Sequence, residues 1–539
     1  MTAISMGSIQ LTSIFTLAIF MAMCCTACNS QDKHVETAVQ QDTVLKGNFS
    51  AATEIAFDSL LIDTFLQSHP DFQQFEADLK KLYRIQKFSY VWYDKHGVPE
   101  ATNNLINHLQ AQQSDGILKN INYPEEFTKI VSELRSGKIQ QPSPRIELML
   151  TAQYFDYAKN VWGGAQVDRA EDMGWYLPKK RLNYTDLLQQ QLKDPTTYAG
   201  QSAVVPQYLA LKEQLNRYQK LAQQGPDVLV TFHAKLKNLL ADDTSAIVPL
   251  IRKRLYQLGD LSDTSSSNHY DPLLQQAVVQ FKERHGIKPS SALTSDFITE
   301  LNVPIRKRIE QMIVNLERMR WVPVDDHGGE FILVNIPEYK LHYYVGNKLD
   351  WDCKVVVGKV MTKTVIFSGH LQHIVFSPYW YVPESIIEKE IKPGMARNPN
   401  YLAQQRMEWN GGHVRQKPGD RNSLGLVKFI FPNSNNIYLH DTPSKPLFEE
   451  DNRAFSHGCI RVSKPRELAI RILKQLPSWT PEKIDRAMHA GNEQTVVLQR
   501  KIPVYIGYFT SFVNSKGLLN FRADVYQRDS RLLNSLMKK

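Results

Sequence analysis

A cysteine and two histidines form the part of this sequence best suited to chemistry. Cys459 follows His457 and Gly458 directly, and sixteen residues separate His440 from His457. A cysteine is nucleophilic only as a thiolate, and a neighbouring imidazole or backbone dipole can lower its pKa. A histidine also supplies general-base capacity near neutral pH. These are the residue types that nucleophilic catalysis at Cys459 would need.

Gly458 adds a second feature, because a glycine just before the sulfur removes a side chain where a substrate carbonyl must approach. Backbone N–H groups there can stabilise a developing oxyanion, by about 3–4 kcal/mol per donor. A lone cysteine beside a histidine is more often a buried structural pair. The longer pattern, Ile437 to Pro443 followed by Ser456 to Val462, favours a catalytic site.

This pattern resembles the catalytic motif of the L,D-transpeptidases, a histidine followed at a set interval by Ser/Thr-His-Gly-Cys. Here the second part is complete as Ser456-His457-Gly458-Cys459. The resemblance covers roughly residues 331–462, including the segments 376–383 and 422–425. The order of regions is similar to the large, lid-bearing periplasmic class of that family.

The resemblance implies catalytic roles for five residues. Cys459 is the expected nucleophile, and His440 is the expected general base, oriented by the backbone carbonyl of Asp441. His457 and Gly458, with the Cys459 amide, are expected to shape the oxyanion hole. The Asp441 side chain has no implied role.

Three further residues are expected to contact substrate. Tyr438 lies beside the expected nucleophile, and Ser456 begins the motif. Arg461 either binds a substrate carboxylate or holds the geometry of a strand end. The insertion 384–426, rich in Pro, Gly and Asn, is expected to be a mobile lid with few buried apolar contacts.

The implied reaction is 3–3 cross-linking of peptidoglycan stem peptides through a Cys thioester, with release of D-alanine and no cofactor. The family resemblance also implies acylation by carbapenems. One alternative keeps the same site as an L,D-carboxypeptidase or cross-link hydrolase. Another is a non-catalytic wall-binding scaffold. Other wall-synthesis proteins are candidate partners.

Two other groups have simpler interpretations. His370 and His373 have a spacing seen in metal sites, but residues three apart on a strand face opposite sides, so no metal is predicted. Cys353 follows Trp351-Asp352 in a predicted strand, and we expect a buried, inert thiol.

The chemistry must be positioned by a mostly β, mixed α/β domain at residues 330–508. Short β-branched runs predict strands, among them 332–336, 340–344 and 354–357. Gly346-Asn347 predicts a hairpin turn between two of them.

Residues 246–303 predict three helices, with Asp271-Pro272 beginning one and Gly259 ending another. They resemble the small peptidoglycan-binding domain. Residues 304–329 predict a linker helix, 53–245 an α-helical scaffold, and 509–539 a C-terminal segment of no assigned role.

The N-terminus predicts export to the periplasmic side of a bacterial membrane. Residues 1–28 combine an apolar run with a lipoprotein-like cleavage box, in which Cys28 would be lipidated, and 29–52 is a polar tether. The anchor would make the membrane a partner. The chain of 539 residues has a net charge of +9 that is scattered along it, with no nucleic-acid-binding motif, so no nucleic-acid partner is predicted. The α-helical scaffold, the three-helix region and the mostly β domain together make the predicted fold class multidomain.

Overall fold

The computed structural model describes residues 55–94, 97–136, 141–178, 180–193, 203–231, 239, 243–324 and 329–537. The predicted signal, Cys28 and the tether lie outside these ranges. From Ser50 to Lys539 the chain forms one compact unit.

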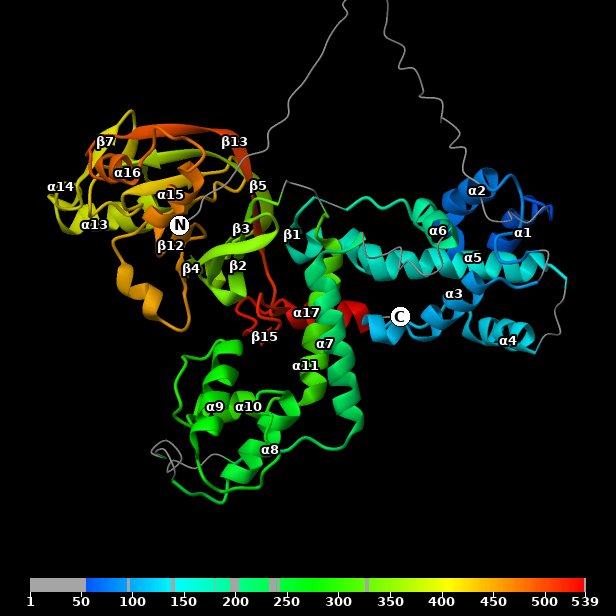
Figure 1. The fold of residues 1–539 in the computed structure, drawn as a ribbon. Helices are drawn as coiled ribbons and strands as arrows, with labels where there is room; N and C mark the ends of the chain where they lie inside the picture. The colour runs from blue at the N-terminus through cyan, green and yellow to red at the C-terminus, as the bar shows by residue number, and fades with distance from the viewer. Residues whose placement is uncertain are drawn as a thin grey trace, which may run out of the picture. The chain divides into compact units, whose positions relative to one another are not determined.

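The scaffold region is helical, as predicted (Figure 1). Its central element is α5 (Pro144–Ala158), in which every residue from Ile146 onward is buried. A helix that is buried all round must be surrounded by other elements. The other α-helices of the scaffold region are α1 (Leu61–Ser68), α2 (Glu76–Ile85), α3 (Glu100–Gln110), α4 (Pro124–Arg135), α6 (Tyr184–Lys193) and α7 (Pro206–Gln223).

The three helices predicted within 246–303 are present as α8 (Val248–Leu258), α9 (Pro272–Arg284) and α10 (Ser295–Leu301). The Asp271 side chain caps α9 by accepting a 2.9 Å hydrogen bond from the Leu274 N–H. Gly259 ends α8 with a φ of +84°, in the left-handed region that favours glycine. The linker helix is α11 (Ile305–Trp321).

A ten-stranded sheet forms the catalytic domain, in the order β1-β5-β13-β2-β3-β4-β12-β10-β9, with β11 paired to β4. Because β9 also pairs with β5, the path closes on itself. The predicted hairpin turn lies between β3 and β4, and both of its residues have positive φ. The strands are β1 (Trp175–Tyr176), β2 (Phe331–Asn335), β3 (Lys340–Val345), β4 (Lys348–Gly358), β5 (Ile366–Phe376), β9 (Val427–Ile430), β10 (Leu439–His440), β11 (Ala454–Ser456), β12 (Ile460–Val462) and β13 (Gln494–Gly507).

Two neighbouring segments complete the support of this sheet. β1 comes from the scaffold region, and its Trp175 pairs with Ile366 at the sheet edge. The C-terminal segment forms β14 (Ser511–Val513), β15 (Leu519–Phe521) and α17 (Asp529–Met537). The helices α15 (Pro465–Leu473) and α16 (Pro481–Met488) lie between β12 and β13 in the chain.

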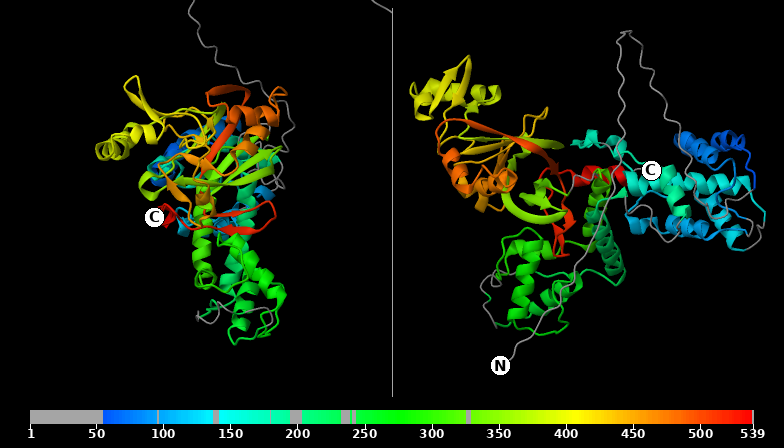
Figure 2. Two further views of the ribbon diagram at one scale, coloured as in Figure 1. Left: turned by 90° about the vertical axis from the view of Figure 1, so that its left-hand side faces the viewer. Right: turned by 45° about the horizontal axis from the view of Figure 1, so that its top comes forward.

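The insertion 384–426 is a folded subdomain, which corrects the expectation of few buried apolar contacts. Both views of Figure 2 show it projecting from the sheet in yellow. Val382, Ile387, Ile391 and Val414 form an apolar cluster separate from the main core. Its elements are α12 (Glu384–Ile386), η10 (Ile387–Ile391), α13 (Lys392–Arg397), α14 (Tyr401–Gln404), β7 (Met407–Asn410) and β8 (His413–Gln416), with β6 (Trp380–Tyr381) pairing β8. The frequent Pro, Gly and Asn residues obscured this cluster because its members are brought together only by the turns between them.

Among the residues described, none of the helices combines the length and apolar character needed to cross a bilayer.

Candidate active site

Two parallel strands place four polar side chains on one face of the sheet. β10 and β12 pair Leu439 with Ile460 and His440 with Arg461. Residues paired directly across strands point to the same face, and alternate residues along a strand do so too. Tyr438, His440, Cys459 and Arg461 therefore share one face, while Leu439 and Ile460 are fully buried on the other.

His440 is oriented by the backbone beside it. Its Nδ1 lies 2.5 Å from the carbonyl oxygen of Asp441, the contact expected from the sequence. A carbonyl only accepts, so Nδ1 carries the proton and Nε2 of the neutral ring has a lone pair; the backbone of Leu424 also hydrogen-bonds to the ring. Burial and the nearby charge of Arg461 lower the pKa of His440 to about 3. The ring is therefore neutral at physiological pH, which suits a proton acceptor.

The Cys459 thiol is also held neutral at rest. Burial raises its pKa, and contacts from Tyr438 and the charge of Arg461 only partly oppose this. Tyr438 contacts both groups: its ring centroid lies 5.7 Å from that of His440, and its side chain is hydrogen-bonded to Cys459. These pKa directions indicate that the Cys459 thiol and the His440 imidazole are both neutral at rest.

The turn before the nucleophile, residues 456–459, is fixed by hydrogen bonds within it. The Ser456 hydroxyl accepts from the Gly458 N–H at 3.0 Å and donates to the Cys459 carbonyl at 2.6 Å. Its bonds are thus made inside the turn and its side chain is buried. The structure places Ser456 as a support of the turn rather than as the substrate contact expected from the sequence.

Gly458 is required by its backbone conformation. Its φ is +123°, which side chains rarely adopt, whereas a Cβ built there would meet no atom closer than the Thr362 carbonyl at 3.9 Å. That distance is an ordinary contact, so the backbone conformation rather than a lack of space favours glycine here.

His457 and Arg461 face different surroundings. Nε2 of His457 lies 3.2 Å from Oε1 of Glu390, which belongs to η10 of the insertion. Nε of Arg461 is buried without a hydrogen-bond partner in the described part of the chain. Because a buried donor without a partner is costly and the side chain is cationic, Arg461 is suited to bind an anionic group that enters the site.

The Asp441 side chain has a structural role that the sequence did not indicate. Its carboxylate accepts from the Leu426 N–H at 2.9 Å and from the Thr442 N–H at 2.7 Å, and it pairs with Lys445 at 2.5 Å. Leu426 is the last residue of the insertion. Asp441 therefore ties the end of the insertion to the strand that carries His440.

A cavity of about 2650 Å³ lies between α9, α11 and the strands β2 to β4. The four polar side chains that share one face of the sheet at β10 and β12 do not line this cavity. It approaches the site through Lys359, whose N–H donates to the Ser456 carbonyl at 3.0 Å.

The remaining candidates from the sequence lie away from this face. Cys353 is buried in β4, and burial raises the pKa of its thiol to about 12. His370 and His373 lie on β5, opposite Pro503 and Val497 of β13. In the described ranges, no group of three His, Cys, Asp or Glu side chains is placed to hold a metal ion.

A thiol, a neutral imidazole and a guanidinium on one sheet face are groups that nucleophilic catalysis by a cysteine would use. Residues 329–497 match the family model of the L,D-transpeptidase catalytic domain, and residues 77–215 match the Scaffold domain.

The chain is 32% identical over 244 residues to a Haemophilus influenzae protein named "Putative L,D-transpeptidase", covering 41% of this chain and 49% of that protein. It thus spans about half the length of this curated relative. A structure of an L,D-transpeptidase from Stackebrandtia nassauensis is 15% identical, covering 53% of this chain and 98% of that one at a TM-score of 0.20. A cysteine-to-serine mutant of the Enterococcus faecium L,D-transpeptidase is 14% identical, covering 33% and 50% at 0.17.

Proposed function

We propose that this protein is an L,D-transpeptidase that forms 3–3 cross-links in peptidoglycan on the periplasmic side of a bacterial membrane. The single observation that best supports this is the shared face of Cys459, His440 and Arg461, with His440 held in the tautomer that accepts a proton at Nε2. The match of residues 329–497 to the catalytic-domain family supports the same reaction.

In the first step, the Cys459 proton passes to Nε2 of His440 while the sulfur attacks the carbonyl carbon of the third residue of a tetrapeptide stem. The carbonyl oxygen becomes an oxyanion that the Cys459 N–H and its neighbours stabilise. When the intermediate collapses, the C–N bond breaks, and the departing D-alanine amine takes the proton from His440. A thioester remains on Cys459.

In the second step, a side-chain amine of another stem attacks the thioester and gives its proton to His440. The C–S bond breaks, a new amide forms, and the returning proton restores the thiol. Arg461 would bind a carboxylate of the donor stem, because its Nε is buried without a protein partner. No cofactor takes part in these steps.

Three further proposals complete this account. Residues 246–303 would bind peptidoglycan, and lipidation of Cys28 would anchor the chain to the membrane. Carbapenems would acylate Cys459, since their strained carbonyl can occupy the donor position.

The decisive experiment is incubation of the purified protein with disaccharide-tetrapeptide, followed by mass spectrometry. We expect a cross-linked dimer with loss of one D-alanine per dimer. Disaccharide-tripeptide without dimer would instead show that water takes the thioester, as in a carboxypeptidase. Unchanged substrate would overturn the proposal.

A further inference from the structure

The hydroxyl group of Tyr526, in the C-terminal segment, is linked through Thr364 to the turn 456–459, here called the catalytic turn. This hydroxyl donates to the Gly358 carbonyl at 2.6 Å and accepts from the Thr364 N–H at 3.2 Å. Tyr526 is 1% exposed and Thr364 is fully buried. Tyr526 lies beyond residue 497, where the match to the catalytic-domain family ends.

Thr364 is also hydrogen-bonded to Gly458, the residue before the expected nucleophile. Its hydroxyl accepts from the Gly358 N–H at 2.9 Å and donates to the Gly458 carbonyl at 2.8 Å. Both hydroxyl groups therefore use a donor and an acceptor bond, so neither side chain is free to turn. Gly358 is packed so closely that an added Cβ would lie 2.0 Å from the Thr362 carbonyl oxygen.

The Gly458 carbonyl and the Cys459 N–H belong to the same peptide unit. In a trans peptide these two groups lie in one plane and point in opposite directions. Fixing the carbonyl through Thr364 therefore also fixes the direction of the Cys459 N–H. That N–H is the donor expected to meet the oxyanion, and misplacement of a catalytic group by about 1 Å can cost 100-fold in rate.

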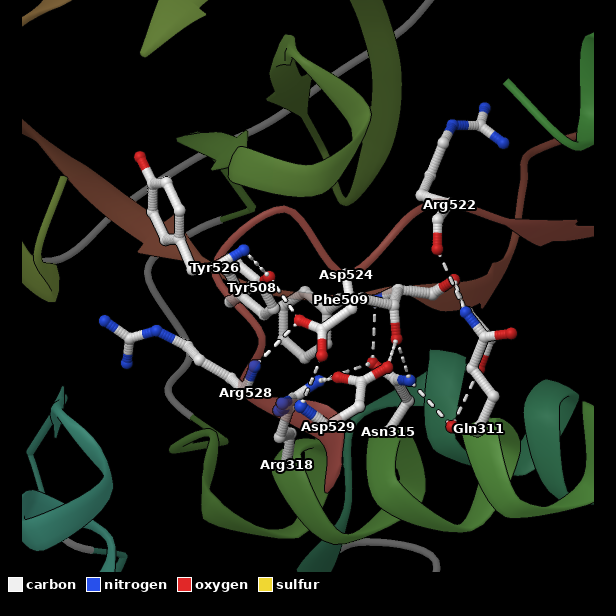
Figure 3. Close-up of polar contacts among 12 residues, drawn as sticks. Gln311, Asn315, Arg318, Tyr508, Phe509, Arg522, Asp524, Tyr526, Arg528 and Asp529 are labelled. Atoms are coloured by element: carbon white, nitrogen blue, oxygen red, sulfur yellow. Dashed lines mark hydrogen bonds and ion pairs between the residues drawn. The ribbon is translucent and has the colours of Figure 1, made fainter. Parts of the chain in front are cut away.

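The other end of Tyr526 is anchored to helix α11, as Figure 3 shows. The Tyr508 hydroxyl accepts from the Tyr526 N–H at 2.7 Å and donates to Asp524 at 2.5 Å. Asp524 also accepts from the Asp529 N–H at 2.8 Å, and Asp529 pairs with Arg318 of α11 at 2.6 Å. Buried bonds thus run from α11 to the catalytic turn.

We infer that Tyr526 is a positioning residue, which acts through Thr364 to aim the Cys459 N–H at the oxyanion. This inference rests on the proposed function, since it requires acyl transfer at Cys459. It assigns a role to the C-terminal segment, for which the sequence offered none.

The test compares two reactions of Cys459 in the full-length protein. Acylation by meropenem forms an oxyanion, whereas alkylation by iodoacetamide displaces iodide and forms none. Tyr526→Phe should slow acylation by about 10- to 100-fold, while the alkylation rate stays close to that of the wild type. Thr364→Val should have the same selective effect, and Thr364→Ser, which keeps the hydroxyl, should restore acylation. The double variant should be acylated no more slowly than the slower of the two single variants, because both substitutions break the same chain of hydrogen bonds.

Tyr343→Phe is the matched control. It removes a hydroxyl that donates to Glu330 at 2.5 Å, and this bond lies away from the site. It should leave both rates unchanged. Equal acylation rates in Tyr526→Phe and wild type would overturn the inference, as would an equal fall in acylation and alkylation in both Tyr526→Phe and Thr364→Val. A wild-type protein that is alkylated but never acylated would remove the proposed function, and this inference with it.

Discussion

Nε2 of His457 lies 3.2 Å from Oε1 of Glu390, so the residue two places before the expected nucleophile is joined to the insertion 384–426. The side chains are 47% and 53% exposed, and a pair this exposed contributes at most about 1 kcal/mol. A contact of that strength can break and re-form as substrate enters. It therefore suits a lid that opens without unfolding.

We predict that Glu390→Gln raises the ratio of hydrolysis to cross-linking, because a lid held less firmly admits water to the thioester. The measurement is the ratio of tripeptide to dimer by mass spectrometry. Glu388→Gln is the matched control, since Glu388 pairs within the insertion with Lys392. An unchanged ratio in Glu390→Gln would leave the contact without this role.

Hydrogen exchange should show that the insertion moves as a body. Its apolar cluster predicts that amides of β7 and β8 stay protected in the free protein, and that amides elsewhere in the insertion gain protection in the acyl-enzyme. Uniformly fast exchange throughout 384–426 would contradict a folded lid. Uniform protection, unchanged by acylation, would contradict movement.

Replacing each of the two cysteines of the described chain in turn should show which one is the nucleophile. Cys459→Ala should reduce activity by roughly 10⁴- to 10⁶-fold, because no other group can form the thioester. Cys353→Ala should retain activity, since that thiol is buried and its pKa is raised to about 12. Intact mass after incubation with a carbapenem should show one adduct, on the peptide containing Cys459. An adduct on Cys353 would contradict the assignment.

The rate of alkylation against pH should report a raised thiol pKa. Burial raises the pKa of Cys459, so the midpoint should lie above that of an exposed thiol. Arg461→Met should move it higher still, because the charge of Arg461 favours the thiolate. His440→Gln should change the midpoint little, because the ring is already neutral, yet greatly reduce turnover. A large upward shift in His440→Gln would instead indicate that a charged His440 imidazole stabilises the thiolate.

Stability should also depend on His440 as pH falls. Its pKa is about 3 in the folded protein, against an ordinary value of about 6.5, so between these values the unfolded chain binds a proton that the folded chain does not. The free energy of unfolding should therefore decrease as pH falls from about 6.5 to 3, by on the order of 5 kcal/mol from this group. Denaturant titrations should show a weaker pH dependence in His440→Gln. Equal dependence in the two proteins would contradict the lowered pKa.

The sequence by itself determined those features that depend on neighbouring residues. The spacing of His440 and Cys459 indicated the chemistry, and the carbonyl of Asp441 was expected to orient the histidine, as the structure shows. Asp271-Pro272 and Gly346-Asn347 predicted a helix start and a hairpin turn. The histidine contact, the helix start and the hairpin turn are each decided within a few positions of the chain, where local backbone preferences dominate.

The tertiary structure alone decided which distant groups meet. Burial and Arg461 make His440 neutral, although its sequence neighbours predict nothing of the kind. The apolar cluster of the insertion forms across turns that read locally as irregular. Tyr526 reaches Gly358 across 168 positions of the chain to support the catalytic turn. Such contacts depend on how the elements pack and on how much water that packing excludes, and no local pattern of residues records either quantity.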